Sequence, residues 1–67
     1  MFVLSGTDGN GKCYITQIHG VYLRTGNRDR AIVFDDEAAA LDILCYLDDL
    51  QLSGRFPRVE ALCIEKI

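Results

Sequence analysis

The 67-residue chain lacks the clustered histidines and cysteines on which metal sites and Cys–His nucleophiles depend. His19 is its only histidine and there is no Cys-x-x-Cys pair, so a zinc site would need His19, Cys13, Cys45 and Cys63 to converge from four separate segments. A Cys–His nucleophile is equally hard to build, because Cys13 and His19 would lie about 20 Å apart on one extended strand. We therefore expect no enzymatic activity, no metal site and no cofactor.

Long hydrophobic runs are also missing. No apolar run approaches the roughly 20 residues that a helix needs to cross a bilayer, and the N-terminal MFVLS is too short for the apolar region of a signal peptide. The three cysteines are odd in number and widely spaced, unlike a disulfide framework. We interpret them as small apolar side chains and expect a cytoplasmic protein.

Basic residues are outnumbered by acidic ones, which gives a net charge of −3. Binding to nucleic acid rests on neutralising phosphates with Lys and Arg, so we expect no direct nucleic-acid contact and no membrane binding. The length predicts a single domain over residues 1–67 with a small core, because a chain this short buries only about 60% of its unfolded surface. A deep enclosed active site is hard to build on such a core.

Short apolar runs separated by turn residues predict strands in the first half of the chain. The expected strands are residues 2–5, 13–18, 21–24 and 31–34. The first two form a β-hairpin with a long tip at GTDGNGK (6–12), the third is a further strand or a continuation of the second, and the fourth leads into a helix.

The helix is expected from Asp36 to Leu52, with Asp35 as its N-cap and Ser53-Gly54 at its end. A last strand, residues 59–67, would place Val59, Ala61 and Cys63 on one face and Leu62 and Ile64 on the other. Apolar residues on both faces indicate a central position in the sheet or a face covered by a partner. The order β-β-(β)-α-β predicts an α+β fold, an antiparallel sheet of three to four strands with one helix packed on one face.

The glycine-rich segment GTDGNGKC (6–13) matches the phosphate-binding pattern G-x-x-x-x-G-K-[ST] except that Cys13 replaces the hydroxyl residue. That pattern binds phosphate because a helix starts directly after it, whereas a predicted strand follows Lys12. Nucleotide binding through residues 6–12 therefore stays an alternative, and the hairpin tip is the preferred interpretation.

The expected helix is acidic, with no Lys or Arg between residues 35 and 52. Acids in its first turn suit the helix dipole, but Asp42, Asp48 and Asp49 have no such reason, and they interrupt an apolar surface too wide for one sheet contact. Leu41 and Leu52 lie on the edge of that surface away from its broad face. The candidate partner-binding residues are Leu41, Asp42, Asp48, Asp49, Leu52, Arg24, Arg28 and Arg30.

Two interpretations of these residues stay open. The acids form a footprint for a basic partner surface, or they are only a solvated face. Similarly, Arg24, Arg28 and Arg30 grip a phosphate or carboxylate, or they form a solvated turn with Asp29 and the nearby helix acids as partners.

The run AIVFDDEA (31–38), with Ala31, Phe34, Asp35 and Ala38, resembles a pattern in small phage- and mobile-element-encoded proteins. These proteins place a β-hairpin before A-x-x-F-(D/S)-x-x-x-A, then a helix and a closing strand, and some are anti-CRISPR inhibitors. The resemblance implies a small acidic protein-binding module that inhibits a nucleic-acid-handling complex. A self-associating adaptor, such as a homodimer, is the alternative.

Overall fold

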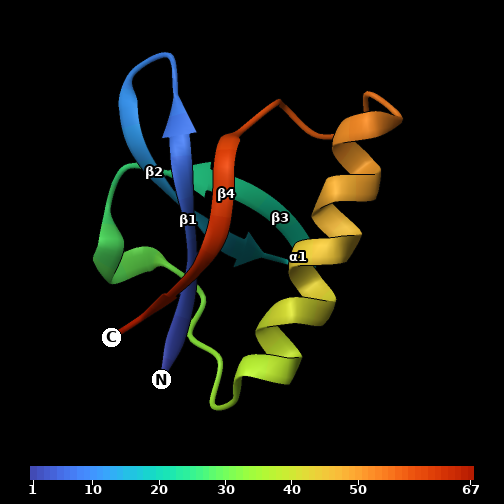
Figure 1. Cartoon of the computed structure of the whole chain (residues 1–67). Coiled ribbons are helices and arrows are strands. Elements are labelled where there is room, and N and C mark those ends of the chain that lie inside the picture. The colour runs from blue at the N-terminus through green and yellow to red at the C-terminus, as the bar shows by residue number, and fades with distance from the viewer.

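The computed structural model describes all 67 residues and shows a four-stranded antiparallel sheet with one α-helix against it (Figure 1). Its elements are β1 (Phe2–Asp8), β2 (Gly11–Ile18), β3 (Val21–Thr25), the 3-10 turn η1 (Arg28–Arg30), α1 (Glu37–Leu52) and β4 (Glu60–Lys66). The strand order is β3-β2-β1-β4. The predicted α+β fold and order of elements are confirmed. α1 is not long and apolar enough to cross a bilayer.

Tight turns join the first three strands. β1 and β2 stay paired as far as Asp8 and Gly11, so the connection is only two residues long and the predicted long tip is wrong. The Asp8 carboxylate accepts a hydrogen bond from the Asn10 N–H at 2.8 Å and holds this turn. His19 and Gly20, with φ of 51° and 80°, join β2 to β3 in the conformation that two-residue hairpins favour.

The predicted strand 31–34 is extended but forms only one bridge to the sheet. β1 and β2 are paired from Ser5 onward, and the 31–34 segment lies between their separated ends. The Ile32 N–H donates to the Ile15 carbonyl at 2.9 Å, while Phe2 and Phe34 exchange two hydrogen bonds of 2.9 and 2.8 Å. The segment thus supplies hydrogen bonds that a direct β1–β2 pairing would otherwise make.

α1 begins one residue later than predicted. The N-cap is Asp36, not Asp35, because the Asp36 carboxylate accepts a hydrogen bond from the Ala39 N–H at 2.8 Å. At the other end the helix stops at Leu52, as predicted, and Gly54 follows with a φ of 76°.

The core lies between the sheet and one face of α1, which confirms the predicted broad apolar face. Its buried members are Leu4, Cys13, Ile15, Phe34, Ala40, Leu47, Phe56 and Val59. On the helix, Ile43, Leu44 and Leu50 are partly buried against this cluster. Cys13 is buried as interpreted, whereas Cys45 and Cys63 are exposed and do not act as core side chains.

β4 is an edge strand, so the predicted central position is wrong. Its register against β1 shifts between Ser5 and Thr7, and Ala61 has a φ of 53°. This β-bulge breaks the simple alternation along the strand. Val59 is consequently buried, whereas Ala61 and Cys63, predicted to share its face, are exposed.

Candidate functional site

The outer surface of α1 carries the predicted partner-binding residues of the helix. On a helical wheel at about 100° per residue they fall within an arc of about 120°. We call Leu41, Asp42, Asp48, Asp49 and Leu52 the outer helix surface. All five are exposed, and Leu52 retains 88% of its accessible surface. The prediction that the sheet cannot cover the whole apolar circumference of the helix is confirmed.

The acids of this surface are free of ion pairs. The chain contains two salt bridges, Lys12 with Glu65 and Arg24 with Asp8, and neither involves the helix. Asp36 differs from the other acids of the segment, because its carboxylate is used as the N-cap. Asp42, Asp48 and Asp49 therefore present unpaired negative charge next to exposed leucines.

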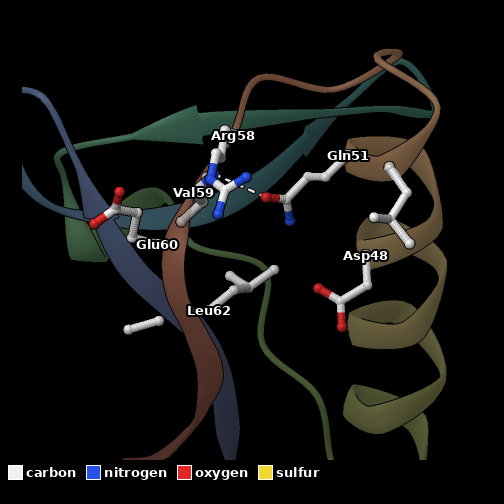
Figure 2. Close-up of a pocket in the computed structure, with 8 residues that line it drawn as sticks. Asp48, Gln51, Arg58, Val59, Glu60 and Leu62 are labelled. Atoms are coloured by element: carbon white, nitrogen blue, oxygen red, sulfur yellow. Dashed lines mark hydrogen bonds between the residues drawn. The ribbon is translucent and has the colours of Figure 1, made fainter.

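A groove runs between the C-terminal half of α1 and the start of β4 (Figure 2). It has a volume of about 550 Å³. The α1–β4 groove is lined by Asp48, Gln51, Leu52, Arg58, Val59, Glu60, Ala61 and Leu62. In Figure 2 the side chains of Asp48 and Leu62 point toward each other from the two walls. The groove thus joins apolar surface to an unpaired carboxylate.

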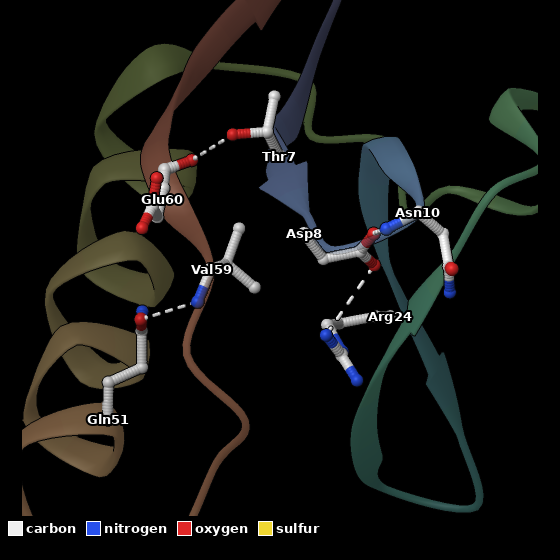
Figure 3. A network of polar contacts seen from close by, with 7 residues as sticks. All are labelled: Thr7, Asp8, Asn10, Arg24, Gln51, Val59 and Glu60. Carbon is white, nitrogen blue, oxygen red and sulfur yellow. Dashed lines mark hydrogen bonds and ion pairs between the residues drawn. The ribbon is translucent and has the colours of Figure 1, made fainter.

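Hydrogen bonds and the bulge hold the β4 wall in place (Figure 3). The Gln51 side-chain oxygen accepts a hydrogen bond from the Val59 N–H at 2.9 Å, which ties the helix to the chain entering β4. Thr7 donates its hydroxyl to the Glu60 carbonyl at 3.4 Å. Beneath the bulge lies Gly6, where an added Cβ would approach Val59 Cγ1 to 2.4 Å and the Glu60 carbonyl oxygen to 2.9 Å. Only glycine lets the two strands approach this closely.

The outer edge of β4 is unpaired. Phe2 directs its backbone hydrogen bonds away from β4, toward Phe34. Because bonding directions alternate along a strand, Val3 and Ser5 direct theirs toward β4, where they face Glu65 and Cys63. The alternate residues Ile64 and Lys66 then direct their N–H and C=O groups outward. No strand pairs with that edge.

The predicted arginines lie elsewhere. Arg24 is on β3 and donates to the Asp8 carboxylate at 3.5 Å (Figure 3). Its partner is the hairpin turn, so the predicted pairing with Asp29 and the helix acids is wrong. Arg28 and Arg30 belong to η1 and form no salt bridge. The structure therefore separates the three arginines from the outer helix surface.

Only Asp48 and Leu52 of the predicted residues line the groove. Sequence reasoning missed Gln51, Arg58 and Glu60. Gln51 did carry a signal, as a polar residue between Leu50 and Leu52 on an otherwise apolar turn. Arg58 and Glu60 carried none, because their position depends on the bulge.

Three side chains have shifted pKa values, and none lines the groove. The hydrogen bond from Lys12 to Glu65, 2.7 Å long, raises the pKa of Lys12 and lowers that of Glu65, and the charge of Arg28 adds to the second effect. Burial, followed by the charge of Asp8, raises the pKa of the Cys13 thiol. No cluster of three or more His, Cys, Asp or Glu side chains is placed to hold a metal ion.

The glycine-rich segment has the geometry of a hairpin. Lys12 lies within β2 and its ammonium group contacts Glu65, so no helix N-terminus follows the turn.

Compared with protein-family models, with curated proteins and with solved structures, the chain shows no match.

Proposed function

We propose that the protein acts by binding another protein through the outer helix surface, without chemistry of its own. The observation that carries the proposal is the set of unpaired carboxylates around Leu41 and Leu52. Exposed leucines gain free energy when a partner covers them, and unpaired acids select a partner whose matching surface is basic.

A basic partner surface suggests the class of target. Proteins that handle nucleic acids carry clustered Lys and Arg residues to neutralise phosphates. We therefore propose that the target is a nucleic-acid-binding complex and that the bound protein inhibits it. Modest net charge, −3 for the whole chain, favours inhibition through protein contacts over imitation of DNA charge.

Affinity capture from a bacterial lysate tests this proposal with a matched pair of variants. In the first, Asp42→Lys and Asp49→Lys reverse two charges of the outer helix surface. In the control, Asp29→Lys and Asp35→Lys make the same change in net charge at exposed positions outside it. We expect the first variant to lose the captured target and the control to retain it.

Salt and competing DNA refine the result. Capture should weaken as salt rises, because exposed charges are screened beyond about 8–10 Å at physiological ionic strength. DNA should compete if the target uses the same basic surface for both ligands. Equal capture by wild type and the Asp42/Asp49 variant at low salt would contradict the proposal and leave the acids as a solvated face.

Self-association is a second candidate, and a different surface favours it. Tyr22 faces the helix, since its ring contacts Tyr46 at a centroid distance of 6.0 Å. Its neighbours Val21 and Leu23 therefore point to the opposite face of the sheet, next to Ile18, which pairs with Val21. All three apolar side chains are between 43% and 57% exposed, and a second copy would bury them.

A further inference from the structure

The lining of the α1–β4 groove ends at Leu62, and the regular, unpaired edge of β4 continues from Cys63 to Lys66. We propose that they bind one extended segment of the partner protein, which pairs with β4 as a fifth strand and places a lysine or arginine side chain in the groove. This inference rests on the proposed function, because it names how the partner engages and the chemistry of the engaging segment.

The backbone of β4 sets where the segment pairs. The bulge at Ala61 interrupts the strand, so the regular ladder available to a partner runs from Cys63 to Lys66, about 13 Å at 3.3 Å per residue. Ile64 and Lys66 supply the outward N–H and C=O groups. Short, bulged edge strands discourage pairing with strands of other chains. The outer edge of β4 is long enough to pair with one short strand.

The groove sets which side chain enters. Leu62 and Val59 form its apolar wall on one side, and Leu52 lies on the other. Asp48 is the unpaired acid that faces across the groove (Figure 2). Lysine and arginine suit such a site, because their aliphatic stems cover apolar surface while the cationic head reaches a carboxylate.

Charge selects a basic segment over an acidic one and over a second copy. Arg58 and Glu60, also in the lining, carry opposite charges, so Asp48 decides the sign. Asp49 on the same helix adds negative charge near it. A second copy paired along β4 would bring another α1 that carries acids and no Lys or Arg, so its helix would offer no basic partner to Asp48.

Binding of short peptides tests the inference. The probe is a fluorescent seven-residue peptide that alternates lysine and threonine. Two matched peptides carry glutamate in place of lysine, or N-methyl groups on every backbone amide. We expect the lysine peptide to bind at least about tenfold more tightly than either, because the glutamate peptide repels Asp48 and the N-methylated one cannot donate to β4.

Variants of the protein locate the site. Lys66→Pro removes an outward N–H without breaking the β1–β4 ladder and should abolish binding of the lysine peptide, whereas Lys66→Ala should retain it. Asp48→Asn should weaken binding about tenfold, and Asp35→Asn, the same change at an exposed acid outside the groove and the outer helix surface, should not. In wild type the amide signals of Ile64 and Lys66 should shift in NMR spectra and exchange more slowly with solvent.

The outcomes separate this inference from the proposed function. Strand addition would be overturned if the N-methylated peptide bound as tightly as the lysine peptide, or if a folded Lys66→Pro variant bound the lysine peptide as tightly as wild type. It would also be overturned if no peptide bound at millimolar concentration, or if the NMR shifts were confined to residues other than Ile64 and Lys66. If Lys66→Pro still captures the target while the Asp42/Asp49 variant does not, the outer helix surface binds the partner and the fifth strand is wrong. Dimers of wild type that Lys66→Pro dissociates would identify a second copy as the occupant and would also overturn it.

Discussion

Burial distinguishes Cys13 from the other two thiols. It is 3% exposed, and burial raises its pKa, so little reactive thiolate forms near pH 8. We expect a thiol reagent at pH 8 to modify Cys45 and Cys63 quickly and Cys13 only when the protein unfolds. The slow phase of thiol modification should be absent in Cys13→Ala. Equal modification rates for the three thiols would contradict the placement of Cys13 in the core.

Gly6 is the residue whose substitution tests the β4 bulge most directly. Gly6→Ala would force Val59 and the Glu60 carbonyl outward, and overpacking of this kind costs about 1–3 kcal/mol. In a domain of this size each kcal/mol lowers the melting temperature by about 4–8 °C. Gly9→Ala is the control, since nothing lies within 4 Å of its added Cβ. Equal melting temperatures for the two variants would contradict the close approach.

At the scale of elements, the start of α1 depends on Asp36. Asp36→Ala removes the hydrogen bond to the Ala39 N–H and should lower the free energy of unfolding by about 1 kcal/mol. Asp35→Ala makes the same change in charge one residue earlier and should have a much smaller effect. Urea denaturation measures both, and a larger loss in Asp35→Ala would place the N-cap at Asp35 after all.

One ion pair connects β2 to β4 across β1. Lys12 lowers the pKa of Glu65, so the stabilisation from Glu65 is present above the ordinary glutamate pKa and is lost as pH falls through the lowered value. The pKa of Lys12 is raised, so its part is present below the ordinary lysine pKa and is lost as pH rises through the raised value. Both groups are partly exposed, so the effect on stability is small.

Titration of the Glu65 carboxyl by NMR measures this pair. Lys12→Ala should raise the pKa of Glu65 toward its ordinary value. Arg24→Ala is the control, because the Arg24 guanidinium pairs with Asp8 and does not contact Glu65. An unchanged Glu65 pKa in Lys12→Ala would show that the 2.7 Å contact is not maintained in solution.

The periodicity of apolar residues predicted the helix and the strands, but it did not predict how β1 and β4 approach each other across the bulge. The pattern of residues 13–18 and the end of the helix at Leu52 follow from local rules of alternation and capping. Neither the edge position of β4 nor the groove follows from such rules, because the first depends on long-range pairing of β4 with β1 and the second on Gly6 lying beneath Val59. A glycine in a strand pattern indicates such an approach, but it does not name the partner residue.

For the whole molecule, the exposed apolar face of the β2–β3 hairpin predicts weak self-association. Leu23→Lys should leave the fold intact, since Leu23 is 43% exposed, and should shift any dimer toward monomer by placing charge in the apolar contact. Sedimentation at increasing concentration measures this. Leu41→Lys, an equivalent change on the helix, serves as the control. A wild type that stays monomeric throughout would contradict the second candidate function.

The position of β1 in the sheet has a consequence for the time course of folding. β1 is an internal strand, yet one of its neighbours, β4, pairs Lys66 with Phe2. Bringing Phe2 and Lys66 together closes a loop of nearly the whole chain, and the entropy of the chain falls before any contact between the strands forms. Sheets built from such distant segments therefore form slowly. While β4 is still undocked, β1 exposes a row of free amides and carbonyls beside the buried side chains of Val3 and Leu4. That partly folded state is the one most exposed to aggregation, and it lasts until β4 docks.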